Sequence, residues 1–313
     1  MKAAAAKEGK LVWYDSLNQE QGDRIISKFQ QAFPMIKEPK FVSVPSGSRV
    51  ARVTQESRAG GPTGDVDFEN AATTAGYYKD GFIVPVDWKA LGVPTSQQMT
   101  PTNYMVAITA AFRGVLYNTN KISEAEAPKS YDDLINPKWT GRIGLWARAA
   151  AFTGLWGTWG EQKLVDYVNA LAKLKPRLYD SNFTIAQAVG AGEVDLSYTD
   201  YHTAIPTIQK GAPVKWITLD PVPVDALYGY VLKYGPNHAA GKLFLYWLTT
   251  PEGSNAYEAE AGRGNPFVAG SNAQKQLAGH QISSVDVNTM IQQADHFNQL
   301  ENQFSQTLKR GAA

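Results

Sequence analysis

The clearest absence in this sequence of 313 residues is cysteine, which does not occur at all. Without thiols the chain has no disulfide scaffold, zinc ribbon, iron–sulfur cluster or cysteine nucleophile. Its apolar runs are all shorter than the ~20 residues that a membrane-spanning helix needs. The chain also has no excess of either charge, because its 30 Lys and Arg residues nearly balance its 29 Asp and Glu residues. Nothing in this balance attracts nucleic acid or an anionic membrane, so we expect neither as a partner.

The sequence also lacks the common signatures of catalysis. The phosphate-loop patterns GxGxxG and GxxxxGK[ST] are absent, as are HExxH and GxSxG. The four histidines are far apart in the sequence and none is paired at metal-ligand spacing: His202, His238, His280 and His296. Three carboxylates, Asp15, Glu69 and Asp200, follow predicted strands and offer a pair for acid–base work. Such scattered carboxylates are common at strand ends, so we expect no catalysis. An α/β enzyme that uses these carboxylates is the alternative.

The chain begins with an alternation of strand-like and helical segments. Residues 19–34 place Ile25, Ile26, Phe29 and Phe33 at helical spacing, which predicts an amphipathic helix after a first strand. The order continues as β-α-β-α-β, which favours a parallel sheet covered by helices. The predicted segments are strand 9–16, helix 19–34, strand 38–47, helix 48–60 and strand 64–70.

A similar alternation starts again in the second third, after the long apolar run 105–119. This run and another near residue 227 are long enough to pass from one unit to a second. We therefore predict two α/β lobes, residues 1–104 with 229–275 and residues 105–228 with 276–313. In open parallel sheets ligands bind at the carboxyl ends of strands, so polar residues at strand ends are the candidate site.

One segment resembles a known signature. Residues 130–144, SYDDLINPKWTGRIG, resemble the DLxxPxWxGx[IV] pattern of periplasmic solute-binding proteins of ABC transporters, in the subgroup related to ferric-iron-binding proteins. The segments GDVDFENAATTAGYYKDGFIVPV and NFTIAQAVGAGEVDLSYTDY resemble further family segments in the same order. The likeness extends over residues 9–268.

The resemblance implies a type II periplasmic-binding-protein fold, in which two strands cross between lobes and the ligand is clamped in the cleft between them. It implies a monomer that is not an enzyme, needs no cofactor and delivers a small-molecule ligand to an ABC transporter permease. It also implies a periplasmic or secreted location, with a signal peptide already removed from this chain.

The same resemblance bears on the ligand. In iron-binding members, the segment that matches SYTDYHTA (197–204) carries two adjacent tyrosines that bind ferric iron, whereas here the pair is Asp200-Tyr201. Asn18 stands where several iron binders have a histidine, and Glu69 and Asn70 straddle the position of a glutamate. Only Glu69, Asp200 and Tyr201 remain as hard oxygen ligands, so ferric iron is the alternative ligand.

The turn that holds an anion in iron-binding members reads WARAAAF here (146–152), with Trp146, Arg148 and Phe152 in place of hydroxyl residues. Arginine beside aromatic rings suits a carboxylate or phosphate on an organic molecule. We therefore expect a polar organic solute with an acid group: an amino-acid derivative, an aminophosphonate or a sugar acid. No metal is expected, and the predicted ligand contacts are Asp15, Ser16, Asn18, Glu69, Asn70, Arg113, Trp146, Arg148, Phe152, Asn182, Asp200, Tyr201 and Tyr228.

Overall fold

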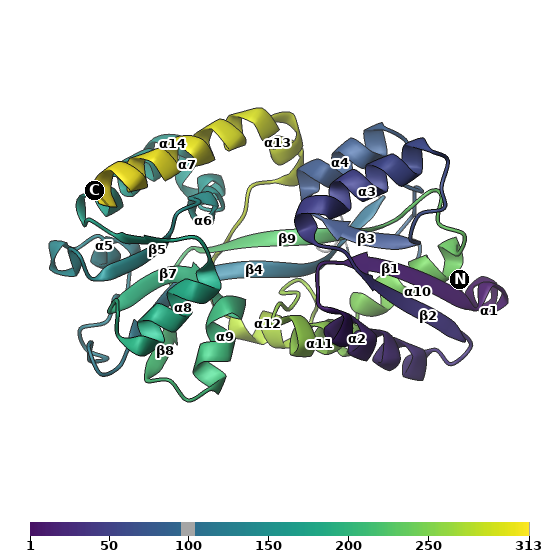
Figure 1. Cartoon of the computed structure of the whole chain (residues 1–313), viewed down its shortest axis with the longest axis horizontal. Coiled ribbons are helices and arrows are strands. Elements are labelled where there is room, and N and C mark those ends of the chain that lie inside the picture. Colours follow the sequence, from purple (N-terminus) through teal and green to yellow (C-terminus); the bar gives the residue numbers. More distant parts are fainter. Residues whose placement is uncertain (95–103, 313) are drawn as a thin grey trace. The chain divides into compact units, whose positions relative to one another are not determined.

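The computed structural model describes residues 1–94 and 104–312 (Figure 1). The chain forms two compact units, each made of two segments. Unit 1 contains residues 1–110 and 226–278, and unit 2 contains residues 111–225 and 279–313. Whether the two units act as the lobes predicted from the sequence remains a prediction.

Unit 1 is built on the parallel strands that the sequence predicts. The strand order is β2-β1-β3-β9, in which β1 is parallel to β2 and β3, and β9 is antiparallel to β3. The strands are β1 (Lys10–Asp15), β2 (Glu38–Ser43), β3 (Val66–Glu69) and β9 (Val222–Val231). The helices are α1 (Lys2–Glu8), α2 (Gln19–Ala32), α3 (Ser46–Arg58), α4 (Ala71–Lys79), α10 (His238–Leu248), α11 (Pro251–Ala261) and α12 (Asn272–Gln276).

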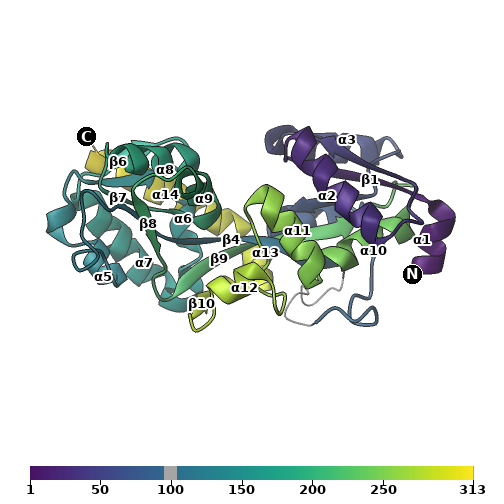
Figure 2. The same ribbon diagram turned by 90° about the horizontal axis from the view of Figure 1, so that it is seen from below.

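Helices cover both faces of the unit 1 sheet, because its strands are apolar on both sides. α3 and α4 lie on one face (Figure 1), while α2, α10 and α11 lie side by side on the other (Figure 2). The core between α2, α10 and the sheet is aromatic: the Trp13 ring lies 4.7 Å from Phe41 and 5.1 Å from Phe244. The predicted helix 19–34 is confirmed as α2, which buries Ile25, Ile26 and Phe29.

Unit 2 has a mixed sheet in the order β4-β7-β5-β6, with β8 paired to β4 and β10 to β9. β5 is parallel to β6 and β7, and β4 is antiparallel to β7 and β8. The strands are β4 (Met105–Asn118), β5 (Ile143–Trp146), β6 (Arg177–Tyr179), β7 (Leu196–Asp200), β8 (Val214–Ile217) and β10 (Ile282–Ser283). The helices are α5 (Tyr131–Leu134), the 3-10 helix η2 (Pro137–Trp139), α6 (Ala150–Thr153), α7 (Trp156–Lys173), α8 (Asn182–Ala191), α9 (Tyr201–Gln209), α13 (Val287–Gln292) and α14 (Ala294–Ala312).

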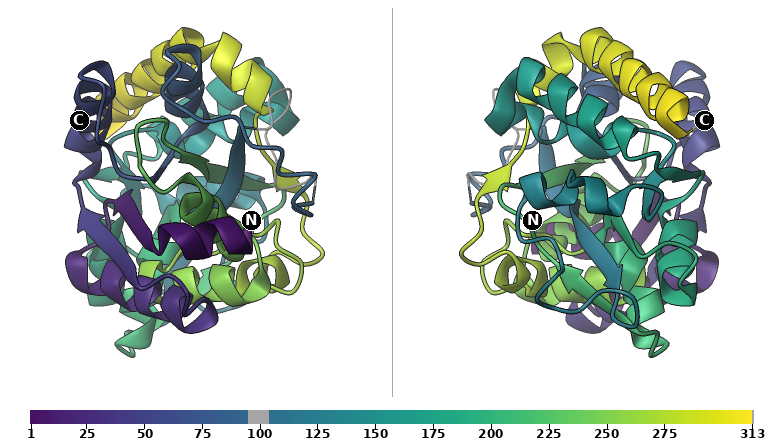
Figure 3. Two further views of the ribbon diagram at one scale, coloured as in Figure 1. Left: turned by 90° about the vertical axis from the view of Figure 1, so that its right-hand side faces the viewer. Right: turned by 90° about the vertical axis from the view of Figure 1, so that its left-hand side faces the viewer.

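The C-terminal helix α14 packs along α7 on one face of the unit 2 sheet (Figure 3), and α8 and α9 lie on the other (Figure 1). The signature residue Trp139 is buried, and its indole Nε1 donates to the Asp133 carbonyl at 2.9 Å, so its role is packing. The long runs near 105 and 227 are β4 and β9, and each contains a boundary between the two units. No helix within residues 1–94 and 104–312 is long and apolar enough to span a membrane.

Candidate functional site

A buried cluster of charged side chains lies at the carboxyl ends of β1 and β3 in unit 1. Asp15 ends β1 and Glu69 ends β3, and both side chains are buried. Arg49 of α3 joins two carboxylates: its Nε lies 2.8 Å from Asp67 Oδ1 and its Nη2 lies 2.7 Å from Glu69 Oε1. Tyr257 donates its hydroxyl to Asp15 at 3.3 Å. We call Asp15, Arg49, Asp67 and Glu69 the unit 1 cluster, and its three carboxylates outnumber its single cation.

Burial dominates the electrostatics of the unit 1 cluster. It raises the pKa of Asp67 to about 7, against the opposing pull of Arg49, and it raises the pKa of Glu69 as well. Burial alone lowers the pKa of Arg49, but Asp67, Asp15 and Glu69 outweigh it and the pKa of Arg49 lies above its ordinary value. Among the described residues, the buried Arg49 Nη1 has no hydrogen-bond partner. The cluster therefore keeps one donor available inside an acidic environment.

Arg49 was not among the residues expected at the site, whereas Asn18 and Asn70 were expected to contact the ligand and instead directly precede helices. Asn18 Oδ1 accepts from the Gln21 amide at 2.9 Å, and Asn70 Oδ1 accepts from the Thr73 amide at 3.0 Å. These are N-caps of α2 and α4, a role that asparagine fills well. The backbone amide of Ser16 donates to Asp15 and helps to hold that carboxylate in place. The structure gives all three residues a local structural role.

A second cluster lies in unit 2, where β4 and β7 pair. The register places Arg113 opposite Asp200. Arg113 Nε lies 2.9 Å from Asp200 Oδ1, and its Nη1 lies 2.6 Å from Asp225 Oδ2. Asn182, the first residue of α8, donates to the other oxygen of Asp200 at 2.8 Å. We call Arg113, Asn182, Asp200 and Asp225 the unit 2 cluster; it carries one net negative charge.

The unit 2 cluster changes the role expected for Arg113. Burial lowers the pKa of Arg113, but Asp225 and Asp200 outweigh burial and raise it above its ordinary value. Two carboxylates already balance this guanidinium, so Arg113, which the sequence places among the ligand contacts, is not a free cation for an acid group. Asn182 Oδ1 is buried and has no hydrogen-bond partner in the described part of the chain, which leaves one acceptor available.

Aromatic rings adjoin both clusters. The ring of Tyr201, the first residue of α9, stacks on Phe112 with 4.8 Å between centroids and meets Trp216 edge-on at 5.1 Å. In unit 1, Tyr228 of β9 stands opposite Glu69 in the strand register. These rings offer the flat apolar walls that small-molecule sites use beside polar groups.

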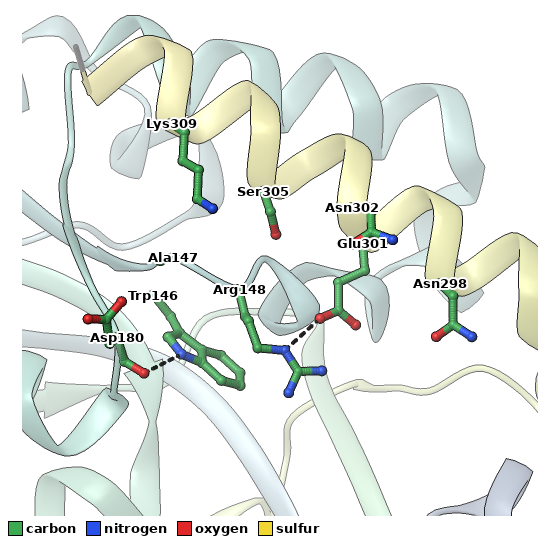
Figure 4. A pocket seen from close by; sticks show the side chains of 9 residues that line it. All are labelled: Trp146, Ala147, Arg148, Asp180, Asn298, Glu301, Asn302, Ser305 and Lys309. Carbon is green, nitrogen blue, oxygen red and sulfur yellow. Dashed lines mark hydrogen bonds and ion pairs between the residues drawn. The ribbon is translucent and has the colours of Figure 1, made fainter.

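Trp146 and Arg148 lie elsewhere in unit 2, at a cavity of about 430 Å³ between the turn after β5 and α14 (Figure 4). Trp146 Nε1 donates to the Asp180 carbonyl at 3.1 Å, and the Arg148 guanidinium lies 5.4 Å from the Trp146 ring. Arg148 Nε donates to Glu301 Oε1 at 2.9 Å, although its side chain is 67% exposed. The cavity is lined by Trp146, Ala147, Arg148, Asp180, Asn298, Glu301, Asn302, Ser305 and Lys309.

Phe152 does not accompany Trp146 and Arg148 at this cavity. Its side chain is 1% exposed, and its ring stacks on Tyr198 at 5.2 Å within the core of unit 2. A core ring cannot contact a solute while the unit stays folded, so we remove Phe152 from the candidate site. The apolar residues around this turn do not show in the sequence which side chains line the cavity and which are buried in the core.

Among the described residues, no group of three or more His, Asp and Glu side chains is arranged to hold a metal ion. Asp200 engages Arg113 and Asn182, and the Tyr201 ring packs between Phe112 and Trp216. What the clusters present is charge-assisted hydrogen bonding.

Comparison with known proteins agrees with this architecture. A profile of the family described as bacterial extracellular solute-binding protein matches residues 24–281. The Fe(3+)-binding periplasmic protein of Serratia marcescens is 28% identical over 198 residues, and the alignment spans 58% of this chain and 58% of that protein.

Two solved structures share the fold. Iron-bound HitA from Pseudomonas aeruginosa is 21% identical with a TM-score of 0.76, over 94% of this chain and 99% of that one. AfuA from Actinobacillus pleuropneumoniae, with exogenous fructose-6-phosphate bound, is 20% identical with a TM-score of 0.71, over 96% and 98%. The predicted two-lobed type II fold is confirmed by these likenesses. The profile covers most of the sequence and describes binding rather than catalysis, so the chain belongs to the family of bacterial extracellular solute-binding proteins and is not an enzyme.

Proposed function

We propose that this chain is the substrate-binding component of an ABC importer and works outside the cytoplasm, where it captures a small polar organic solute that bears an acid group. An amino-acid derivative, an aminophosphonate or a sugar acid fits this description. Family membership supports the binding role, and the name of the Serratia relative places that protein in the periplasm. The transporter permease is the proposed partner.

The contacts of the Asp200 carboxylate support an organic solute over iron. Both of its carboxylate oxygens are engaged, one by Arg113 at 2.9 Å and the other by Asn182 at 2.8 Å. Ferric iron needs anionic oxygens that are free to coordinate, whereas an organic solute needs only donors and acceptors in fixed positions. Breaking a buried ion pair to free Asp200 is costly, so the arrangement favours hydrogen bonding to a solute.

In this proposal, the charge of each cluster selects the kind of solute group that it binds. The unit 1 cluster has two more carboxylates than cations, and the unit 2 cluster has one more. Both therefore suit an ammonium group or hydroxyl donors. An acid group is repelled by such clusters and fits better beside Arg148, where it meets the Trp146 ring as well.

Capture by lobe closure, as expected from the sequence, is part of this proposal. A ligand shifts a protein toward a closed state only by binding that state more tightly than the open one. Desolvated, charge-assisted hydrogen bonds supply such a difference in affinity, at about 1.5–3 kcal/mol each.

Ferric iron remains the second candidate, because the Serratia relative is named for it and because Glu69, Asp200 and Tyr201 are oxygen donors. An absorption band from a phenolate–iron bond on adding ferric citrate would support it.

The test of the preferred proposal measures dissociation constants for Asp200→Asn and Arg148→Ala by titration calorimetry. Each variant should bind the solute at least about tenfold more weakly. Asp200→Asn weakens the hold on Arg113 and Asn182, which fixes the unit 2 cluster, and Arg148→Ala removes the contact proposed for the acid group. Arg177→Ala is the control, because Arg177 pairs with Glu193 on the surface of the same unit. Wild-type affinity in both site variants would rule out these contacts.

A further inference from the structure

Residues of the amphipathic helix α14 line one side of the cavity beside Arg148. This helix buries Phe297, Leu300, Phe304 and Leu308, which recur at helical spacing and fix its rotation against unit 2. The residue after each of these lies at the border of the buried face. These four border residues, Asn298, Glu301, Ser305 and Lys309, all line the cavity.

The two cations at this cavity differ in how their charge is balanced. Glu301 holds Arg148 at 2.9 Å, so the charge of that guanidinium is compensated within the fold. Lys309 has no carboxylate within ion-pair distance in the part of the chain that the structure describes. Figure 4 shows its ammonium group directed toward the space above Trp146. Lys309 is therefore the uncompensated cation of the cavity.

Ser305 adds a hydroxyl donor at the same place. Its Oγ accepts the Ala149 amide at 3.0 Å, which uses the oxygen as an acceptor. Among the described residues its hydroxyl proton has no acceptor, and Figure 4 shows the hydroxyl pointing into the cavity between Lys309 and Arg148. An ammonium group and a hydroxyl donor that converge on one space call for an anionic oxygen acceptor.

We infer that Lys309 and Ser305 of α14 bind the acid group of the captured solute in this cavity, with Trp146 and Arg148 as the facing wall. The inference rests on the proposed function and deepens it. Lys309 acts together with Arg148 in selecting for an acid group, and the volume of about 430 Å³ suits a small organic molecule. A carboxylate and a phosphonate both present anionic oxygens. The experiment therefore uses separate probes for these two acid groups.

The test uses the full chain and four probes in titration calorimetry. 2-Aminoethylphosphonate and β-alanine carry the same amine with a phosphonate or a carboxylate, and glucuronate represents the sugar acids. Ethanolamine lacks the acid group and is the matched comparison. Wild type and three variants are titrated: Lys309→Met, which removes the charge, Lys309→Arg, which keeps it, and Arg310→Met. Arg310 is the neighbouring cation on α14 and does not line the cavity.

The inference predicts that Lys309→Met weakens binding of the acid-bearing probes at least tenfold and leaves ethanolamine unchanged. Lys309→Arg and Arg310→Met should stay within about threefold of wild type. If wild type binds an acid-bearing probe and Lys309→Met binds it equally well, the inference is overturned while the proposed function stands. If wild type binds none of the acid-bearing probes, the proposed function fails for these classes and the inference fails with it.

Discussion

Replacing Arg113 by methionine tests whether the unit 2 cluster is a buried network of coupled charges. Methionine keeps much of the buried aliphatic volume but removes the guanidinium that lies 2.9 Å from Asp200 and 2.6 Å from Asp225. Asp200 is then left as a buried carboxylate with Asn182 as its remaining side-chain donor. Removing one partner of a buried ion pair costs about 3–5 kcal/mol.

The expected loss lies at the low end of that range. The Asp225 side chain is 42% exposed and can be rehydrated, and Asp200 retains its bond from Asn182. We therefore expect Arg113→Met to lower the free energy of unfolding by about 3 kcal/mol. Arg177→Met, which breaks the exposed pair with Glu193, should cost about 0–1 kcal/mol.

Urea unfolding followed by circular dichroism and tryptophan fluorescence measures both losses and tests whether unfolding is two-state. The double variant Arg113→Met with Asp200→Asn should lose less than the sum of its single changes, by about 1–3 kcal/mol. A loss for Arg113→Met no larger than that for Arg177→Met would refute the view that the unit 2 cluster is a buried, coupled network.

Two further predictions concern the core and the effect of pH. Phe152→Ala should lower the free energy of unfolding by about 3–5 kcal/mol while the folded variant binds solute with wild-type affinity; a selective loss of affinity would return Phe152 to the site. Burial raises the pKa of Asp67 to about 7, so the stability from this group is present below about pH 4 and is lost as the pH rises through 7. Urea unfolding at pH 5 and pH 8 should therefore show a smaller difference for Asp67→Asn than for wild type, and an equal difference would contradict the shift.

The sequence predicts the fold well because alternation of strand and helix is a local signal. The helix over 19–34 and the strand ends at Asp15, Glu69 and Asp200 can all be identified from neighbouring residues. Periodicity decides these elements without knowledge of the tertiary structure.

The charge state of the site cannot be predicted in the same way, because it depends on partners far apart in the sequence. Arg148 pairs with Glu301 across 153 positions, and Arg113 meets Asp200 only because β4 and β7 are paired. Arg49 occupies an ordinary helix in the sequence, and nothing local indicates that it lies between Asp67 and Glu69. Such pairings determine which cations remain free for a ligand.

We propose that this binding protein captures an organic solute with an acid group rather than ferric iron. The most direct measurement is a thermal-shift comparison of wild type with 2-aminoethylphosphonate, β-alanine, glucuronate and ferric citrate. A ligand at about 1,000 times its dissociation constant stabilises the folded state by about 4 kcal/mol, which raises the melting temperature by several degrees. We expect such a rise with at least one organic acid and none with ferric citrate. A rise with ferric citrate alone, together with a phenolate–iron absorption band, would contradict it.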